Sequence, residues 1–160
     1  MADKRNDTPL AQEIASFWRF ISSSIDRLVG CLEGLNEQEL NWRPLATANS
    51  LYVLAAHTLG NTEENLLGVL CGQPVQRQRE AEFADQGISA EIIQARWVQL
   101  RERVLENIVQ LSAADLDRER KHPRRGRLTG RDVLIIVARH TAEHLGQAEL
   151  TRDLLLAERD

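Results

Sequence analysis

Two histidines near the C-terminus, His140 and His144, have the spacing of a pair of metal ligands. Residues four apart on an α-helix lie one turn apart on the same face, so both imidazoles can bind one divalent cation, with metal–nitrogen distances of about 2.0–2.1 Å. Both also fall within the apolar stripe of their predicted helix, where a bundle normally holds aliphatic side chains. The spacing therefore indicates either half of a metal site or two buried histidines satisfied by local hydrogen bonds.

A catalytic zinc site usually combines three protein ligands with an open position for water. His57 is the best third ligand by position, because it lies in the middle of another predicted helix and bundle metal sites are built from facing helices. Its side of the helix also carries Asn61 and Glu64, which either orient the ligands or face solvent. The remaining candidate, His122, lies in a basic loop and is predicted to be solvated.

Four long helices must position these residues, and no segment has a convincing strand pattern. The first is predicted to begin at Thr8-Pro9 with a threonine cap and a proline in the first turn. A short capped turn or helix follows at 36–39. Apolar residues at helical spacing predict a second long helix from Asn49 or Ser50 to about residue 72 and a third from about 89 to 111. The fourth is predicted from Thr129, where Thr129 and Asp132 have the spacing of a capping box, to about residue 156.

The connection between the second and third helices, residues 72–88, is long for a compact bundle at about 17 residues. Fully extended, it could reach over about 50 Å, whereas the helix before it is only about 30 Å long. It can therefore cross the whole bundle, so that the second and third helices run parallel. A length of 160 residues suits one domain. The sequence predicts an all-α, single-domain four-helix bundle over residues 1–160, with one long crossover.

Composition and charge exclude several classes of partner. The net charge of −4 argues against general affinity for nucleic acid or for an anionic membrane surface. The chain has no apolar run of the roughly 20 residues that a membrane span needs, and its first residues hold no apolar signal core. A cytoplasmic location is expected.

The two cysteines, Cys31 and Cys71, are far apart in the sequence and do not have CxxC spacing. They are interpreted as ordinary thiols.

The chain resembles the DinB-like family, bacterial four-helix-bundle proteins often described as metal-dependent hydrolases. The resemblance covers nearly the whole chain and rests on Leu40-Asn41-Trp42-Arg43-Pro44, on His57 early in the second helix, and on His140-Thr141-Ala142-Glu143-His144-Leu145-Gly146-Gln147, continuing to 152–155. It implies a metal triad of His57, His140 and His144 that binds nickel or zinc. It also implies an up-down-down-up helix order, in agreement with the long crossover, and a homodimer.

The resemblance leaves the reaction open, because some relatives are thiol S-transferases that use bacillithiol or mycothiol, others look like hydrolases or isomerases, and many have no established activity. Three imidazoles around a divalent ion leave a position where water is acidified toward a pKa of about 7, or where a thiol is held as thiolate. We therefore expect a metal-dependent thiol transferase or hydrolase that acts on a small molecule. The alternatives are a noncatalytic metal-binding dimer that serves as a sensor or binding module, and a bundle with an empty site.

Residues that could support catalysis are few. Gln147 lies on the metal face and is the candidate catalytic residue, since it could hydrogen-bond a bound water or a substrate, or else satisfy a neighbouring helix. A zinc-protease mechanism is disfavoured, because glutamate must directly follow the first histidine and Thr141 occupies that place. Arg124, Arg125 and Arg127 could attract an anionic cosubstrate, although a solvated basic loop is the favoured interpretation.

Overall fold

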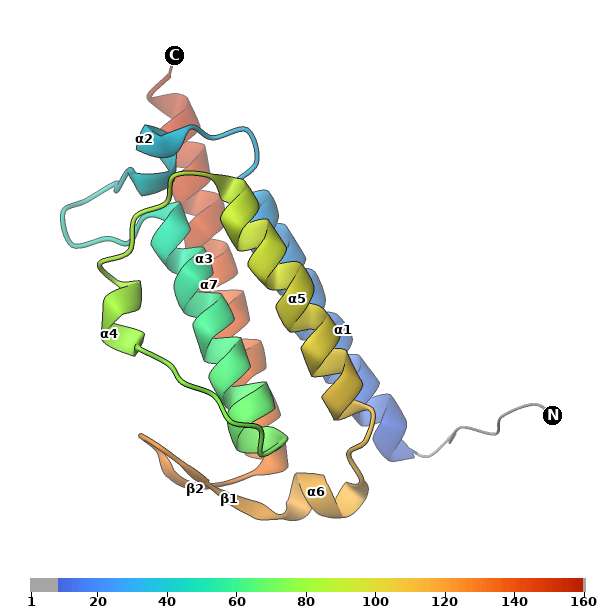
Figure 1. Ribbon diagram of the computed structural model, residues 1–160. Helices are drawn as coiled ribbons and strands as arrows, with labels where there is room; N and C mark the ends of the chain where they lie inside the picture. Colours follow the sequence, from blue (N-terminus) through green and yellow to red (C-terminus); the bar gives the residue numbers. More distant parts are fainter. Residues whose placement is uncertain (1–8, 160) are drawn as a thin grey trace.

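The computed structural model describes residues 9–159, and most of them are helical (Figure 1). Thr8, the predicted cap of the first helix, lies outside this part of the chain. Within it, no helix is both long enough and apolar enough to cross a lipid bilayer. The elements are α1 (Pro9–Gly30), α2 (Glu37–Asn41), α3 (Leu51–Thr62), the π-helix η1 (Glu63–Leu70), α4 (Arg79–Glu82), α5 (Ala90–Ile108), α6 (Ala113–Asp117), β1 (Glu119–His122), β2 (Gly126–Thr129) and α7 (Gly130–Ala157).

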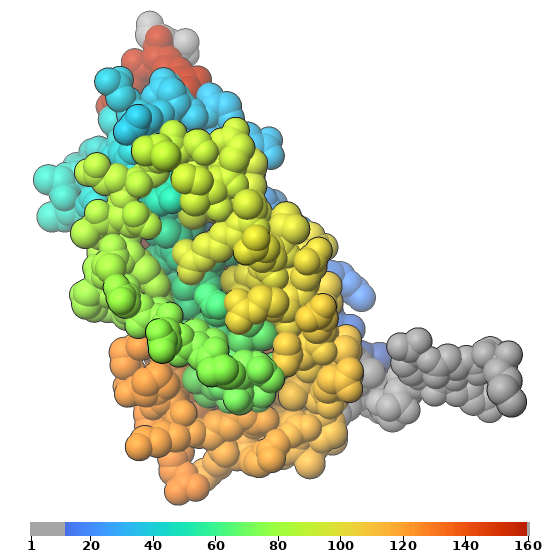
Figure 2. Space-filling view, viewed as in Figure 1, coloured from blue at the N-terminus to red at the C-terminus, as the bar shows by residue number. Residues whose placement is uncertain are grey.

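Four long helical segments lie side by side: α1, α3 continued by η1, α5, and α7. α7 packs against α1 and α3, and α5 packs against α3 and α1. In Figure 1, α1 and α7 run in one direction, and α3 and α5 run in the other. Between α3 and α5, residues 72–88 return along the outside of α3 and carry the short helix α4. The long connection therefore joins two helices that run the same way, and it covers part of α3 on the outer surface (Figure 2).

The core between these helices is aliphatic, and it contains the predicted apolar stripes. Full burial of one such side chain contributes about 1.5–3 kcal/mol to folding. The main buried side chains are Ile14, Ile21, Ile25, Leu28 and Leu32 of α1 and its end, Leu59, Leu66, Leu67 and Leu70 of α3 and η1, Ile93, Trp97, Leu100, Val104 and Ile108 of α5, and Val133, Val137, Ala148 and Leu155 of α7.

Caps fix where the helices begin. Ser50 Oγ accepts a hydrogen bond from the backbone nitrogen of Val53 at 3.2 Å, which starts α3. Reciprocal side-chain and backbone bonds between Thr129 and Asp132 form a capping box at the start of α7. The same motif forms at Asn36 before α2. These three starts agree with the sequence, because an oxygen-bearing cap side chain satisfies amide groups that a helix start leaves unpaired.

The second long helix changes type at Glu63, which its periodicity does not predict. From there it is a π-helix, and at its end the Cys71 nitrogen donates to the Leu66 carbonyl, five residues back, at 3.0 Å. Single π-turns are rare and occur often at functional sites. In this wider helix the adjacent Glu64 and Asn65 are both buried, so η1 presents two polar side chains to the structure around it.

The basic segment before α7 is a β-hairpin, whereas the sequence shows no strand pattern. β1 and β2 are antiparallel, with Glu119 opposite Thr129 and His122 opposite Gly126. Gly126 has φ +76°, a conformation that glycine adopts without steric cost. The hairpin docks on η1, where Arg120 Nε donates to the Leu70 carbonyl at 3.0 Å. Strands this short and charged lack the apolar alternation by which strands are recognised, so the expectation of no strand was wrong.

Candidate metal centre

The structure brings together the three histidines singled out in the sequence. α7 presents His140 and His144 on successive turns, and α3 presents the buried His57 toward them. The Nε2 atom of His140 lies 3.1 Å from Nε2 of His57 and 3.1 Å from Nε2 of His144. One ligand nitrogen from each ring lies within 4.8 Å of the other two. The edges of three imidazoles therefore converge on one point between two helices.

These separations fit a shared metal ion. Two nitrogens that are each about 2.05 Å from one ion lie about 2.9–3.3 Å apart when the angle between them is about 90–109°. The observed 3.1 Å falls within that interval for both neighbours of His140. Three imidazoles are also a donor set that zinc and nickel accept. The ligand nitrogens of His57 and His144 lie within 4.8 Å of each other, so a small movement of these side chains would let all three residues bind one divalent ion.

The outward nitrogens of His57 and His144 fix their tautomers. His57 Nδ1 lies 2.8 Å from Oε2 of Glu82, and His144 Nδ1 lies 2.8 Å from Oε1 of Gln147. Arg77 Nη2 also lies 3.3 Å from His57 Nδ1, but the contact with the Glu82 carboxylate is the shorter one. A carboxylate or amide oxygen only accepts, so with these partners each Nδ1 carries the hydrogen and each Nε2 directs a lone pair inward. This is the arrangement that metal-binding histidines normally have.

Hydrogen bonds alone leave this cluster incompletely satisfied. The two inward lone pairs of His57 and His144 both face Nε2 of His140, which offers at most one proton. The other nitrogen of His140, Nδ1, is buried without a hydrogen-bond partner within residues 9–159. A cation accommodates three lone pairs at once, so the donor set suits metal binding better than a closed hydrogen-bonded group.

The electrostatic surroundings keep His140 and His144 neutral. Burial, together with the neighbouring His144 and His57, lowers the pKa of His140 to about 2. Burial also lowers the pKa of His144, although the hydrogen bond to Gln147 opposes it. Neutral imidazole is the form that binds a metal, so protons do not compete for these two rings near neutral pH.

An ionic network that the sequence did not reveal lies behind His57. Arg77, whose side chain is only 5% exposed, donates from Nε and Nη2 to the two carboxylate oxygens of Glu82, each at 2.7 Å. Its Nη1 donates to Oε2 of Glu64 at 3.0 Å, and Arg124 of the hairpin bonds the same glutamate. Arg77 and Glu82 lie in the long connection and match no local motif. The only signal was that connection's unusual length.

Hydrogen bonds hold the two carboxyl groups of this network ionised. Burial alone would raise the pKa of Glu82, but hydrogen bonds from Arg77 and His57 outweigh it and lower that pKa. Burial likewise opposes ionisation of Glu64, and Arg124 and Arg77 together lower its pKa. Glu64 and Asn61 are both buried, which contradicts the alternative that they face solvent. Asn61 Oδ1 has no hydrogen-bond partner in the described part of the chain.

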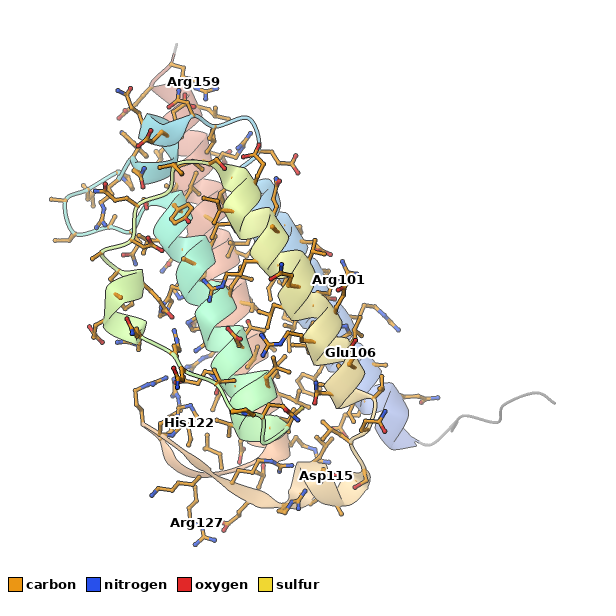
Figure 3. The ribbon with its side chains drawn as sticks, viewed as in Figure 1. Arg101, Glu106, Asp115, His122, Arg127 and Arg159 are labelled. Atoms are coloured by element: carbon orange, nitrogen blue, oxygen red, sulfur yellow. The ribbon has the colours of Figure 1, made fainter. Side chains whose placement is uncertain are left out.

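His122 is a structural residue rather than a solvated one. It is 2% exposed, its Nε2 lies 3.2 Å from Oδ1 of Asn65, and its Nδ1 accepts from the Arg124 nitrogen at 3.0 Å. The expectation of solvation was wrong because the hairpin folds this ring onto η1 (Figure 3). Arg124 also turns inward, where it bonds Glu64. Arg127 points away from the helices (Figure 3) and pairs with Glu119 on the surface. His122 is not part of the histidine cluster.

Surface features border the centre on two sides. The ring of Phe83, at the end of α4, lies 4.7 Å from that of His57, centroid to centroid. A groove of about 290 Å³ runs between α7 and the loop before α3. Its lining residues are Pro44, Thr47, Ala48, Asn49, Leu54, Gln147, Leu150, Thr151 and Leu154.

Cys31 and Cys71 are free and lie outside the histidine cluster. Burial raises the pKa of Cys71 to about 11, so its thiol is a poor nucleophile.

Comparison with known proteins gives one family and several similar structures. The model of the DinB superfamily matches residues 21–148. A DinB-like protein from Bacillus cereus has 16% sequence identity and a TM-score of 0.70, over 88% of this chain and 89% of that one. A DinB-like protein from Bacillus subtilis has 18% identity and a TM-score of 0.52, over 89% of this chain and 91% of that one. No curated protein matches the sequence. Because the family model spans most of the sequence, including all three clustered histidines, the chain belongs to the DinB superfamily.

Proposed function

We propose that this chain is a divalent-metal-dependent enzyme that acts on a small molecule, by thiol transfer or by hydrolysis, with His57, His140 and His144 as the metal ligands. The observation that carries the proposal is the convergence of three Nε2 atoms, with 3.1 Å on either side of His140. Membership of the DinB superfamily supports it. We further propose that the chain is one domain, a four-helix bundle in up-down-down-up order, and a homodimer.

The chemistry follows from a neutral ligand set. When bound, a zinc or nickel ion supplies Lewis acidity that deprotonates water or a thiol near neutral pH. Three uncharged imidazoles leave the full positive charge of that ion to act at the open position. The protein's own contribution is to fix the tautomers of His57 and His144 through Glu82 and Gln147, and to keep His140 and His144 neutral through burial.

Gln147 is the proposed catalytic residue. Its Oε1 faces His144, which leaves its amide nitrogen to donate to a substrate beside the centre. The groove that contains Gln147 continues along α7 past Leu150 and Leu154. We propose that it binds the apolar part of the small-molecule substrate, because apolar surface next to one donor is typical of small-molecule sites. A low-molecular-weight thiol is the favoured cosubstrate.

A noncatalytic metal-binding sensor or binding module is the second candidate, and one observation favours it. The carboxylate that contacts His57, Glu82, is fully engaged by Arg77 and by His57 Nδ1. It is therefore badly placed to accept a proton from a reacting molecule. An enzyme with this site would depend on the metal and on Gln147, rather than on a carboxylate base.

Two measurements test the proposal. Protein purified without a histidine tag is analysed for bound metals, and about one zinc or nickel per chain is expected for the wild type and for His122→Asn, but none for His144→Ala. Metal-loaded protein is then assayed with a panel of thiols and an electrophilic acceptor, and with a panel of esters and amides. Absence of metal from the wild type would contradict the proposed site. Full metal occupancy without turnover of any of these compounds would favour the binding module.

A further inference from the structure

His57 is the ligand whose orientation the helices alone do not fix. His140 and His144 share α7, so the helix sets their relative position. His57 comes from α3, and its ring must be aimed across a helix–helix interface. Its outward nitrogen, Nδ1, meets the carboxylate of Glu82 at 2.8 Å, across 25 residues of chain.

Glu82 is itself held rigidly. The guanidinium of Arg77 binds both of its oxygens at 2.7 Å, a bidentate arrangement that fixes the plane of the carboxylate. Arg77 is anchored in turn by Glu64, which also binds Arg124 of the hairpin. The carboxylate that meets His57 is therefore fixed by contacts to η1 and, through η1, to the hairpin.

Gly60 of α3 leaves the space that the contact between Glu82 and His57 needs. A Cβ atom on Gly60 would lie 2.2 Å from Oε1 of Glu82 and 3.1 Å from Nε of Arg77. Any other residue at 60 would displace the pair from His57, which lies one turn earlier. The glycine thus lets the long connection approach the backbone of α3 closely beside the proposed ligand.

We propose that Glu82 is the positioning residue of the metal centre: it holds His57 in the Nδ1–H tautomer and aims Nε2 at the ion, and Arg77 holds Glu82 in place. The inference rests on the proposed metal site, and it makes the 72–88 connection part of that site rather than a passive linker. A carboxylate behind a ligating histidine orients the ring and raises its basicity, and its loss typically weakens metal binding by about 10–100-fold.

The test compares two variants of nearly equal size, Glu82→Gln and Glu82→Met. Both remove the charge that pairs with Arg77, but only the glutamine offers an oxygen to His57 Nδ1. We expect Glu82→Met to bind zinc about 10–100-fold more weakly than the wild type, and Glu82→Gln to recover most of that loss. Glu80→Gln is the control, because that side chain lies on the same short helix and is 86% exposed. Affinities are measured by competition with a chromophoric chelator.

A second readout needs no metal. Long-range proton–nitrogen NMR spectra of the metal-free protein report which nitrogen of His57 carries the hydrogen. The Nδ1–H tautomer is expected in the wild type, in Glu80→Gln and in Glu82→Gln, with a shift toward Nε2–H in Glu82→Met. Unchanged zinc affinity in Glu82→Met, or an Nε2–H tautomer in the wild type, would overturn the proposal. Failure of the wild type to bind zinc or nickel contradicts the proposed function instead, and the tautomer measurement still tests the contact.

Gly60→Ala disrupts the same contact between Glu82 and His57 by a change on α3. It replaces Glu82→Met in the test if that variant does not fold. Its added Cβ must displace Glu82, so we expect about tenfold weaker zinc binding and loss of the Nδ1–H preference. Gly146→Ala is the matched control, since a Cβ there meets nothing within 4 Å although it lies on α7 beside His144. Equal zinc affinity in the two alanine variants would contradict the positioning role.

Discussion

The Nε2 atoms of His57 and His140 lie 3.1 Å apart, although 83 residues separate the two histidines in the chain. Neither ring can donate to the other without leaving a lone pair or an N–H group unsatisfied, because His57 Nδ1 is committed to Glu82 and His140 Nδ1 has no partner in the described structure. Two helices thus hold polar atoms together in a half-buried site at a free-energy cost, which a bound cation would offset.

Zinc binding should therefore stabilise the fold. A ligand at 100 times its dissociation constant stabilises the folded state by about 2.7 kcal/mol, so the melting temperature should rise with zinc and fall with a chelator. In His140→Ala we expect no zinc-dependent rise. With a chelator present, the free energy of unfolding of His140→Ala should lie within about 1 kcal/mol of that of the wild type. The reason is that the substitution also removes a buried nitrogen that has no hydrogen-bond partner. Scanning calorimetry with and without zinc measures both. A zinc-dependent rise that persists in His140→Ala would show that the ion binds elsewhere.

Much of the fold could be predicted from local signals. Apolar residues at helical spacing located the long helices, and the capping-box pattern of Thr129 and Asp132 gave the start of the last one. The π-helix and the hairpin could not be predicted in this way. η1 keeps an apolar pattern that also suits an α-helix, and strands β1 and β2 are charged and depend on docking against η1.

The candidate site was predictable only where its residues are close in sequence. His140 and His144 are recognised from their spacing, because one helix brings them together. His57 could be recognised as the third ligand only from its position on a facing helix or from the family resemblance. Arg77 and Glu82 match no pattern, since each is defined by partners from other segments. The burial of His122 was missed because its sequence neighbours are basic, whereas its contacts are with Asn65 and the Arg124 backbone.

Gln147 should separate metal binding from catalysis. In Gln147→Ala, His144 Nδ1 loses its acceptor, and we expect about tenfold weaker zinc binding. In Gln147→Glu a carboxylate oxygen can still accept, so zinc binding should stay close to that of the wild type. If the amide nitrogen donates to the substrate, Gln147→Glu should nevertheless lose kcat/KM, since it has no such donor. Chelator competition and steady-state kinetics measure the two effects. Glu143→Gln is the control, because Glu143 pairs with Arg139 on the surface beside His144.

His122 should make folding stability depend on pH below neutrality. Burial and the nearby Arg124 lower its pKa in the folded protein, whereas the unfolded chain has the ordinary value of about 6.5. Below about pH 6.5 the unfolded chain therefore binds a proton that the folded protein does not, and the free energy of unfolding falls as the pH falls. Urea unfolding in a chelator at pH 7.5 and 5.5 should show this decrease, and His122→Gln should show a smaller one. An equal decrease in both proteins would assign the effect to other groups.

Arg77 should contribute far more to stability than Arg79, although the two are neighbours in the same connection. Arg77 is 5% exposed and neutralises Glu82 and Glu64, whose side chains are 11% and 12% exposed, so Arg77→Met leaves two carboxylates buried with fewer partners. Breaking a buried ion pair on one side typically costs about 3–5 kcal/mol. Arg79 pairs with Glu80, and their side chains are 41% and 86% exposed, so Arg79→Met should change the free energy of unfolding by less than about 1 kcal/mol. Urea unfolding of both variants in a chelator gives the comparison without any contribution from metal. Similar losses in the two variants would mean that the buried network does not hold the long connection against α3.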